Sequence, residues 1–289
     1  LKDIYNNPYY YYADILRKLK YQNHPRRQAI LSTTDIDQWD ADESLTIYKD
    51  RFADAGDFTF VFVGNIDTAT ARSLLPRYLG NLPTTGRRES WKNPMAALAS
   101  GSIDSTIIRG SDPKARVDLT WHDKFNYSDA AQRYGFYTMG AYLNTRLREK
   151  LREELGAVYG INLSALLLPL PEEIYRINLS FECEPLRVEE LITEANKEIS
   201  LLKEGKIDPT SLESLFEIQR QERKEGLLQN NFWMQQLSLR AQYNLPLSGI
   251  SQESLEDNIQ SFTPDILSEI AKSCFETDNY FRIILLPEN

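Results

Sequence analysis

The stretch IYRINLSFEC, residues 174–183, has the clearest strand pattern in the sequence. Its apolar and polar side chains alternate, with Ile177, Leu179, Phe181 and Cys183 on one side and Asn178, Ser180 and Glu182 on the other. Because successive side chains of a strand point to opposite faces, this alternation predicts a strand with one buried and one polar face. The elements around this strand decide the fold class.

Further strands are expected on both sides of this stretch. One precedes it at residues 158–166, and two follow residue 101, the second of which alternates Val117, Leu119 and Trp121 with polar residues. A last strand is expected at 280–286. These strands come in pairs and not in regular alternation with single helices. The pattern therefore predicts an α+β fold, a mostly antiparallel sheet with helices packed on one face.

The helices between these strands have clear boundaries. Residues 128–154 are expected to form one long helix, since apolar residues recur every four positions at Met139, Leu143, Leu147, Leu151 and Leu155. A second helix is expected at 187–204. Asp208-Pro209 and Thr263-Pro264 each place a capping residue before a proline, which predicts helices to about residues 228 and 275. Shorter helices are expected near 231–243 and 252–259.

The first 83 residues predict three helices, at 9–20, from Thr34 to about Phe52 with Thr34 and Asp37 as a capping box, and at 68–78. The unbroken apolar run FTFVFV, residues 58–63, predicts a strand buried on both faces. A lone strand cannot form a sheet, so we expect an incomplete domain with an exposed β edge that pairs with itself.

The polar, Gly- and Pro-containing residues 84–101 favour a domain boundary. We therefore expect a truncated first domain at 1–95, a linker at 96–100 and a complete second domain at 101–289.

The composition limits the classes of partner. Hydrophobic residues make up 42% of the chain and charged residues 26%, which is typical of a globular protein. The net charge of −9 argues against binding to nucleic acid or anionic lipid. No signal peptide is expected, and the sequence has no run of about 18 apolar residues, so no membrane span is expected either.

The residues that usually carry enzyme chemistry are scarce. The two histidines, His24 and His122, lie in neither an H-E-x-x-H nor an H-x-x-E-H arrangement, so no metal site is predicted in this chain. No G-x-S-x-G elbow, P-loop or G-x-G-x-x-G motif is present. Cys183 and Cys274 could pair, but their apolar surroundings favour two buried thiols.

The segment LNTRLREKLREELGAVYGINLS, residues 143–164, is the best candidate for a functional site. Arg152 is expected in the last helical turn and Tyr159 at the start of the next strand. Such a corner can bring a guanidinium and a phenol to one mouth of the sheet, where both can donate hydrogen bonds to a carbonyl or an oxyanion. The residues alone favour a structural interpretation, in which Arg152 pairs with Glu149 or a helix carbonyl and Tyr159 caps the core.

Several motifs resemble one family. Residues 152–159, REELGAVY, match the helix-end motif R-E-x-x-G-x-x-Y of the insulinase/pitrilysin metallopeptidases. Residues 48–67 resemble that family's helix-to-strand unit, and residues 78–83 its usual sequel. Glu89-Ser90-Trp91 and Phe232-Trp233 are similar to the bacterial zinc-protease branch.

This resemblance implies the C-terminal, non-catalytic half of a clamshell zinc metallopeptidase. In that family an N-terminal half carries H-x-x-E-H and the zinc, and the Arg and Tyr of the other half, here Arg152 and Tyr159, bind the substrate backbone and stabilise the oxyanion. The expected partners are a zinc-bearing half, in the same polypeptide or as a subunit, and a peptide. For a bacterial protein, the resemblance implies a location in the periplasm or cell envelope. Alone, the chain should be inactive.

Two alternatives remain. One is an inactive scaffold of the same fold, similar to the core proteins of a respiratory complex, and the other is an unrelated peptide-binding module.

Overall fold

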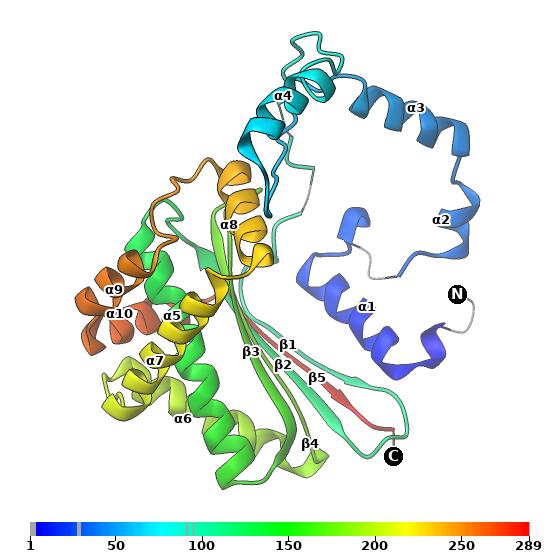
Figure 1. The fold of residues 1–289 in the computed structure, drawn as a ribbon. Coiled ribbons are helices and arrows are strands. Elements are labelled where there is room, and N and C mark those ends of the chain that lie inside the picture. The colour runs from blue at the N-terminus through cyan, green and yellow to red at the C-terminus, as the bar shows by residue number, and fades with distance from the viewer. Residues whose placement is uncertain (1–3, 28–29, 91, 95, 289) are drawn as a thin grey trace. The chain divides into compact units, whose positions relative to one another are not determined.

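The computed structural model describes residues 4–27, 30–90, 92–94 and 96–288, shown in Figure 1. Trp91, part of one motif above, lies outside them. The chain forms two compact units, each built from separate stretches of sequence. The first unit contains the described residues within 1–30, 95–218 and 257–289, and the second those within 31–94 and 219–256.

The first unit is built on one five-stranded sheet. Its strands are β1 (Ile103–Ile108), β2 (Ala115–Lys124), β3 (Val158–Leu168), β4 (Ile174–Cys183) and β5 (Tyr280–Leu286). They lie in the order β1-β5-β2-β4-β3, with β1 and β5 parallel and every other neighbouring pair antiparallel. Burial alternates residue by residue along β4, as the sequence predicts. The α+β class and the mostly antiparallel sheet are confirmed.

One face of the sheet is covered by helices. These are α5 (Ala130–Leu147), α6 (Val188–Lys203) and α10 (Pro264–Phe275). The Tyr175 hydroxyl, on the same face as Leu179, donates to the Cys274 carbonyl at 2.9 Å. Gly140 brings α5 close to β3, since a Cβ there would lie 2.6 Å from Cβ of Ala165. The helix face of the sheet is therefore closely packed.

The opposite face of the sheet also carries a helix. Tyr12 of α1 (Pro8–Lys20) packs in one buried cluster with Phe281, Ile283 and Leu285 of β5. The predicted helices on one face are thus joined by α1 on the other. The reason is that β1 and β5 are apolar on this side as well. This unit crosses the expected linker at 96–100, and the division of the polypeptide into domains at 1–95 and 101–289 stays a prediction.

The long helix predicted at 128–154 changes character before its end. It is α-helical to Leu147 and continues as a π-helical segment, Arg148–Glu154. The amide of Leu155 accordingly donates to the Lys150 carbonyl, five residues back, at 3.2 Å. Gly156, at φ +56°, ends the segment, and β3 begins two residues later.

The remaining helical elements follow the predicted order. They are α2 (Thr33–Asp37), α3 (Ala41–Phe52), α4 (Thr68–Tyr78), α7 (Pro209–Gly226), α8 (Asn230–Tyr243) and α9 (Gln252–Ser261), with 3₁₀ turns at Ile4–Asn6, Pro25–Arg27 and Pro185–Arg187. None of the helices in the described ranges has the length and apolar character that a membrane crossing requires.

The predicted cap of the second helix is wrong. Ser32 and Asp35 form the capping box of the short α2, instead of Thr34 and Asp37. A separate helix, α3, then begins after Asp40, whose carboxylate accepts hydrogen bonds from the amides of Asp42 and Glu43. Two competing caps eight residues apart divide what the sequence predicts as one helix.

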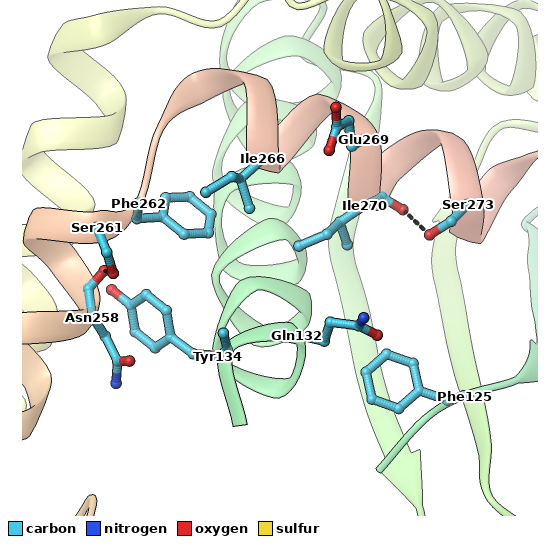
Figure 2. A pocket seen from close by; sticks show the side chains of 11 residues that line it. Phe125, Gln132, Tyr134, Asn258, Ser261, Phe262, Ile266, Glu269, Ile270 and Ser273 are labelled. Atoms are coloured by element: carbon cyan, nitrogen blue, oxygen red, sulfur yellow. Dashed lines mark hydrogen bonds between the residues drawn. The ribbon is translucent and has the colours of Figure 1, made fainter. Parts of the chain in front are cut away.

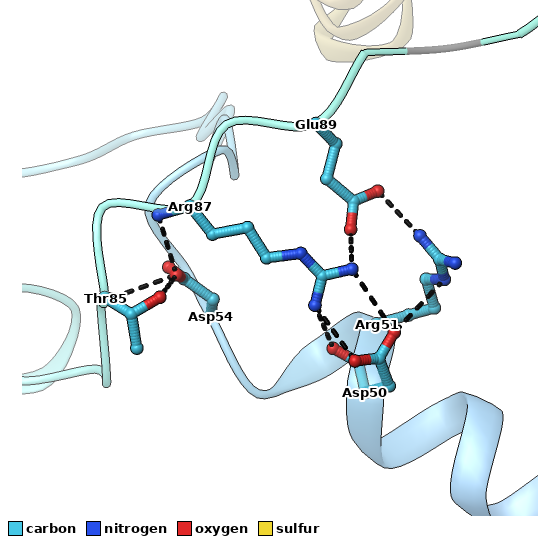
Figure 3. A network of polar contacts seen from close by, with 6 residues as sticks. All are labelled: Asp50, Arg51, Asp54, Thr85, Arg87 and Glu89. Atoms are coloured by element: carbon cyan, nitrogen blue, oxygen red, sulfur yellow. Dashed lines mark hydrogen bonds and ion pairs between the residues drawn. The ribbon is translucent and has the colours of Figure 1, made fainter.

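The strand predicted at residues 58–63 is not formed. This segment pairs with no strand in the described part of the chain, and Phe58, Phe60 and Phe62 are 40%, 44% and 54% exposed. An extended run needs a neighbour for its backbone groups to become a buried strand. Polar contacts hold the neighbouring loops instead, as Figure 3 shows: Asp54 accepts from the amides of Thr85 and Arg87 at 2.9 and 3.2 Å.

Candidate functional site

Arg152 lies in the π-helical segment with its side chain exposed. Its guanidinium makes no hydrogen bond or ion pair within the described residues. The structural interpretation of pairing with Glu149 is wrong, because that carboxylate accepts from Arg146 at 2.8 Å. All the guanidinium donors of Arg152 are therefore unused by the described residues.

Tyr159 is the second residue of β3 and is 64% exposed. The register of β3 on β4 shifts here: Val158 lies opposite Cys183 and Gly160 opposite Glu182, so Tyr159 is the extra residue of a β-bulge. Val158, at 8% exposure, is the residue that enters the core at this point. The interpretation of Tyr159 as a core cap is therefore wrong.

The corner between these two residues is fixed by its backbone. The amide of Ala157 donates to the Leu151 carbonyl at 3.1 Å, and the Leu155 carbonyl accepts from the Arg187 guanidinium at 3.5 Å. The two side chains thus flank one short connection, and both are open to solvent. No hydrogen bond joins them in the described structure.

Lys114 is a third residue at this corner, and no motif or spacing in the sequence selects it. Its ammonium lies 4.7 Å from the ring centroid of Tyr159, in a cation–π contact. Lys114 ends the connection between β1 and β2, and Ala115 and Val158 are both opposite Cys183, so the two strands begin at the same end of the sheet. Only the sheet order could have placed it beside Tyr159.

The histidines do not form a metal site. His24 accepts from the Arg26 amide at 3.3 Å in a loop. His122 is buried in the sheet, where desolvation lowers its pKa, and its Nε2 has no partner among the described residues. No group of three or more His, Cys, Asp or Glu in the described ranges could hold a metal ion.

The cysteines are not activated for chemistry. Cys183 and Cys274 are free and buried, as favoured from the sequence. Burial raises the pKa of the Cys183 thiol to about 11 and that of the Cys274 thiol to about 12. Because the thiolate is the reactive form, both are poor nucleophiles near neutral pH.

A cavity of about 350 Å³ lies elsewhere in the first unit, between the start of α5 and helix α10. Figure 2 shows the rings of Tyr134 and Phe262 and the side chains of Ile266 and Ile270 around it. Glu269 is the only charged residue in its lining. Arg152 follows the other end of α5, a helix of 18 residues and so about 27 Å long. The cavity is therefore separate from the Arg152–Tyr159 corner.

Residues 38–217 of the chain match the family model of the peptidase M16 inactive domain. The chain belongs to this family. This chain is similar to the probable zinc protease PqqL of Escherichia coli K12, at 26% identity over 199 residues. These residues cover 68% of this chain and 21% of that protein. It also resembles the zinc protease PQQL-like of Arabidopsis thaliana, at 22% identity, with 98% of this chain and 32% of that protein covered. The chain thus spans about a fifth to a third of the length of these relatives.

Solved structures share the fold of this inactive domain. The periplasmic protease PqqL from Escherichia coli superposes with a TM-score of 0.84 at 21% identity, covering 99% of this chain and 31% of that one. The peptidase M16 inactive domain from Pseudomonas fluorescens gives 0.74 at 17% identity, covering 100% and 68%. Members of this family are named as zinc proteases, while the described part of this chain has no metal-binding cluster.

Proposed function

We propose that this chain is the non-catalytic half of a zinc-dependent metalloendopeptidase, in which Arg152 and Tyr159 bind the substrate backbone and stabilise the oxyanion. One observation carries this proposal: an unpartnered guanidinium and an exposed phenol stand on one backbone-fixed corner of an inactive domain. Neither side chain donates a hydrogen bond within the described chain, so the donors of both are open to a bound peptide.

The two residues supply different donors. The planar guanidinium of Arg152 offers a fork of N–H groups that can hold a peptide carbonyl, and the Tyr159 hydroxyl offers one O–H. Zinc would be bound by the other half and would polarise the scissile carbonyl. As negative charge develops on that oxygen, donors already in place stabilise it without reorganising, which is the source of the rate increase.

The partners follow from the same proposal. The zinc-bearing half is part of the same polypeptide or a separate subunit, and together the two halves enclose the peptide. PqqL of Escherichia coli is described as a periplasmic protease. We therefore infer that this chain also works in the periplasm or cell envelope.

The test uses the full-length protein, or this chain combined with its zinc-bearing half. We expect Arg152→Ala and Tyr159→Phe each to lower kcat by about 10- to 1000-fold, as for the loss of an oxyanion donor. Arg148→Ala is the matched control, since Arg148 is an exposed arginine of the same π-helical segment. Unchanged turnover in both site variants would assign the pair to structure, whereas no peptide hydrolysis by the zinc-loaded wild type would leave an inactive scaffold as the better account.

A second measurement concerns the metal. The isolated chain should contain no stoichiometric zinc by elemental analysis after purification without chelators, because the described residues hold no group of three or more metal-ligating side chains. One tightly bound zinc per chain would contradict this assignment of His24 and His122.

A further inference from the structure

Three cationic side chains on the segments around Tyr159 differ in whether they are neutralised. Arg116 pairs with Asp118 at 3.1 Å and Glu182 at 3.4 Å, and so is already balanced. Lys114 and Arg152 have no carboxylate within ion-pair distance in the described chain. An unpaired lysine therefore lies against the exposed phenol, and an unpaired arginine stands seven positions earlier in the sequence at the same helix-to-strand corner, in a chain whose net charge is −9.

The position of Lys114 is also specific. Its side chain is half-buried, and its ammonium lies 4.7 Å from the centroid of the Tyr159 ring. A cation over a ring face is attracted to it, so this contact restricts the orientation of the phenol. The lysine reaches Tyr159 from a different connection of the sheet and can thus act on it independently of Arg152.

We propose that Lys114 is a third substrate-binding residue, which positions the Tyr159 phenol and, with Arg152, makes the site select peptides that carry a carboxylate next to the cleaved bond. This inference rests on the proposed function. The carboxylate belongs either to an Asp or Glu side chain or to a free C-terminus. Both have the same charge and the same acceptor oxygens.

The expected size follows from elementary electrostatics. One unit charge about 4 Å from a carboxylate in water stabilises it enough for roughly fivefold tighter binding. Two such charges, partly screened, give about a tenfold preference for an acidic over a neutral peptide. Because the charges are exposed, the preference should fall as the ionic strength rises above about 0.1 M.

The experiment measures kcat/KM of the full-length, zinc-loaded protein on matched peptides. One pair differs only by Asp or Asn beside the cleaved bond, and a second pair only by a free or amidated C-terminus. We expect the acidic member of at least one pair to be preferred about tenfold at low salt. Lys114→Met should lower this preference to that of one charge, roughly fivefold or less, and Lys114→Arg should retain it. Lys124→Met is the control, since Lys124 is an exposed lysine at the other end of β2.

The outcomes separate this inference from the proposed function. A loss of preference for Asp over Asn in Lys114→Met assigns the carboxylate to a side chain, and a loss for the free acid assigns it to a C-terminus. If Arg152→Ala and Tyr159→Phe lower turnover while Lys114→Met keeps every preference of the wild type, the inference is wrong and the proposed function stands. If the Arg152 and Tyr159 variants turn over normally, both fail.

Discussion

Lys20 allows a quantitative test of the packing of α1. Its side chain is 7% exposed, and its ammonium donates to Thr120 Oγ1 at 2.8 Å and to Asn178 Oδ1 at 3.3 Å. Burial lowers its pKa from the ordinary 10.5 to about 8, although the charge of Asp118 acts in the opposite direction and that of Arg176 in the same one. We propose Lys20→Met as the perturbation, because methionine keeps a long, unbranched side chain and removes the charge.

The pKa shift gives the magnitude and the sign. A fall from 10.5 to about 8 corresponds to about 3 kcal/mol, at about 1.4 kcal/mol per pKa unit. The folded pKa lies below the unfolded one, so the unfolded chain binds the proton more strongly. The free energy of unfolding therefore rises with pH between about 8 and 10.5, and the full penalty applies below pH 8.

Other groups titrate in the same window and have to be cancelled. Burial raises the pKa of Tyr12 and Tyr175, which lowers stability as the pH rises above the ordinary tyrosine value. These contributions are common to the wild type and Lys20→Met, so the difference between the two proteins isolates Lys20. Lys18→Met is the matched control: Lys18 is a lysine of the same helix, is 46% exposed and pairs with Asp14 at 2.7 Å.

The assay is urea unfolding followed by circular dichroism at several pH values from 7 to 10. The free energy of unfolding of the wild type minus that of Lys20→Met should rise by about 2 kcal/mol over this range. The same difference for Lys18→Met should not rise, because its hydrogen bond to Asp14 raises the Lys18 pKa. If the difference in free energy of unfolding between the wild type and Lys20→Met stays flat or falls with pH, the conclusion that Lys20 is a buried, charged ammonium is wrong.

Two further predictions concern packing. Gly140→Ala should lower the free energy of unfolding by about 1–3 kcal/mol in urea titrations, since its Cβ would lie 2.6 Å from that of Ala165, and adding Ala165→Gly should restore most of the loss. Gly135→Ala should cost less, because the group it meets is the flexible end of a side chain. The isolated chain should self-associate in sedimentation runs through its exposed aromatic segment at 58–63, and Phe60→Ser should weaken this association; a clean monomer at high concentration would contradict it.

Local signals in the sequence predicted most of the second half of the chain. The alternation in residues 174–183 is the burial pattern of β4. Thr263 caps α10 as expected, with its hydroxyl accepting from the Ile266 amide at 3.4 Å, and Asp208 accepts from the Ser211 amide at 2.9 Å. These signals succeed because each depends on residues within one turn of the helix or one strand.

Contacts between distant residues could not be predicted in this way. Tyr12 donates to the Ile283 carbonyl at 3.0 Å across 271 positions of sequence, and this contact helps to hold α1 on the sheet. Lys114 likewise meets Tyr159 only through the strand order. No period or spacing in a single sequence indicates such distant pairs. The sequence therefore predicted neither the packing of α1 on the second face of the sheet nor the position of Lys114 beside Tyr159.

The spacing of apolar residues contained a signal for the π-helical segment, but the prediction of one continuous helix did not use it. Apolar residues recur every four positions from Met139 to Leu155, whereas an α-helix has 3.6 residues per turn, so a strict repeat of four drifts around the helix. A wider π turn absorbs this drift. Leu147 and Leu151 lie on either side of the change from α-helix to π-helix, and both are fully buried. The strict four-residue spacing was therefore the signal in the sequence for this change.

The bulge at Tyr159 explains why this corner differs from an ordinary helix-to-strand connection. In a regular ladder Tyr159 would share a face with Leu163 and Leu167, which are buried at 7% and 6% exposure, and would become the core cap that the residues alone favoured. The extra residue places Val158 on that face and turns the phenol outward. The π turn, the left-handed Gly156 and the bulge all depart from regular geometry within residues 148–160, and the left-handed conformation is one that glycine adopts without strain. On the proposed function they have one common reason, since together they keep Arg152 and Tyr159 out of the core and available to substrate.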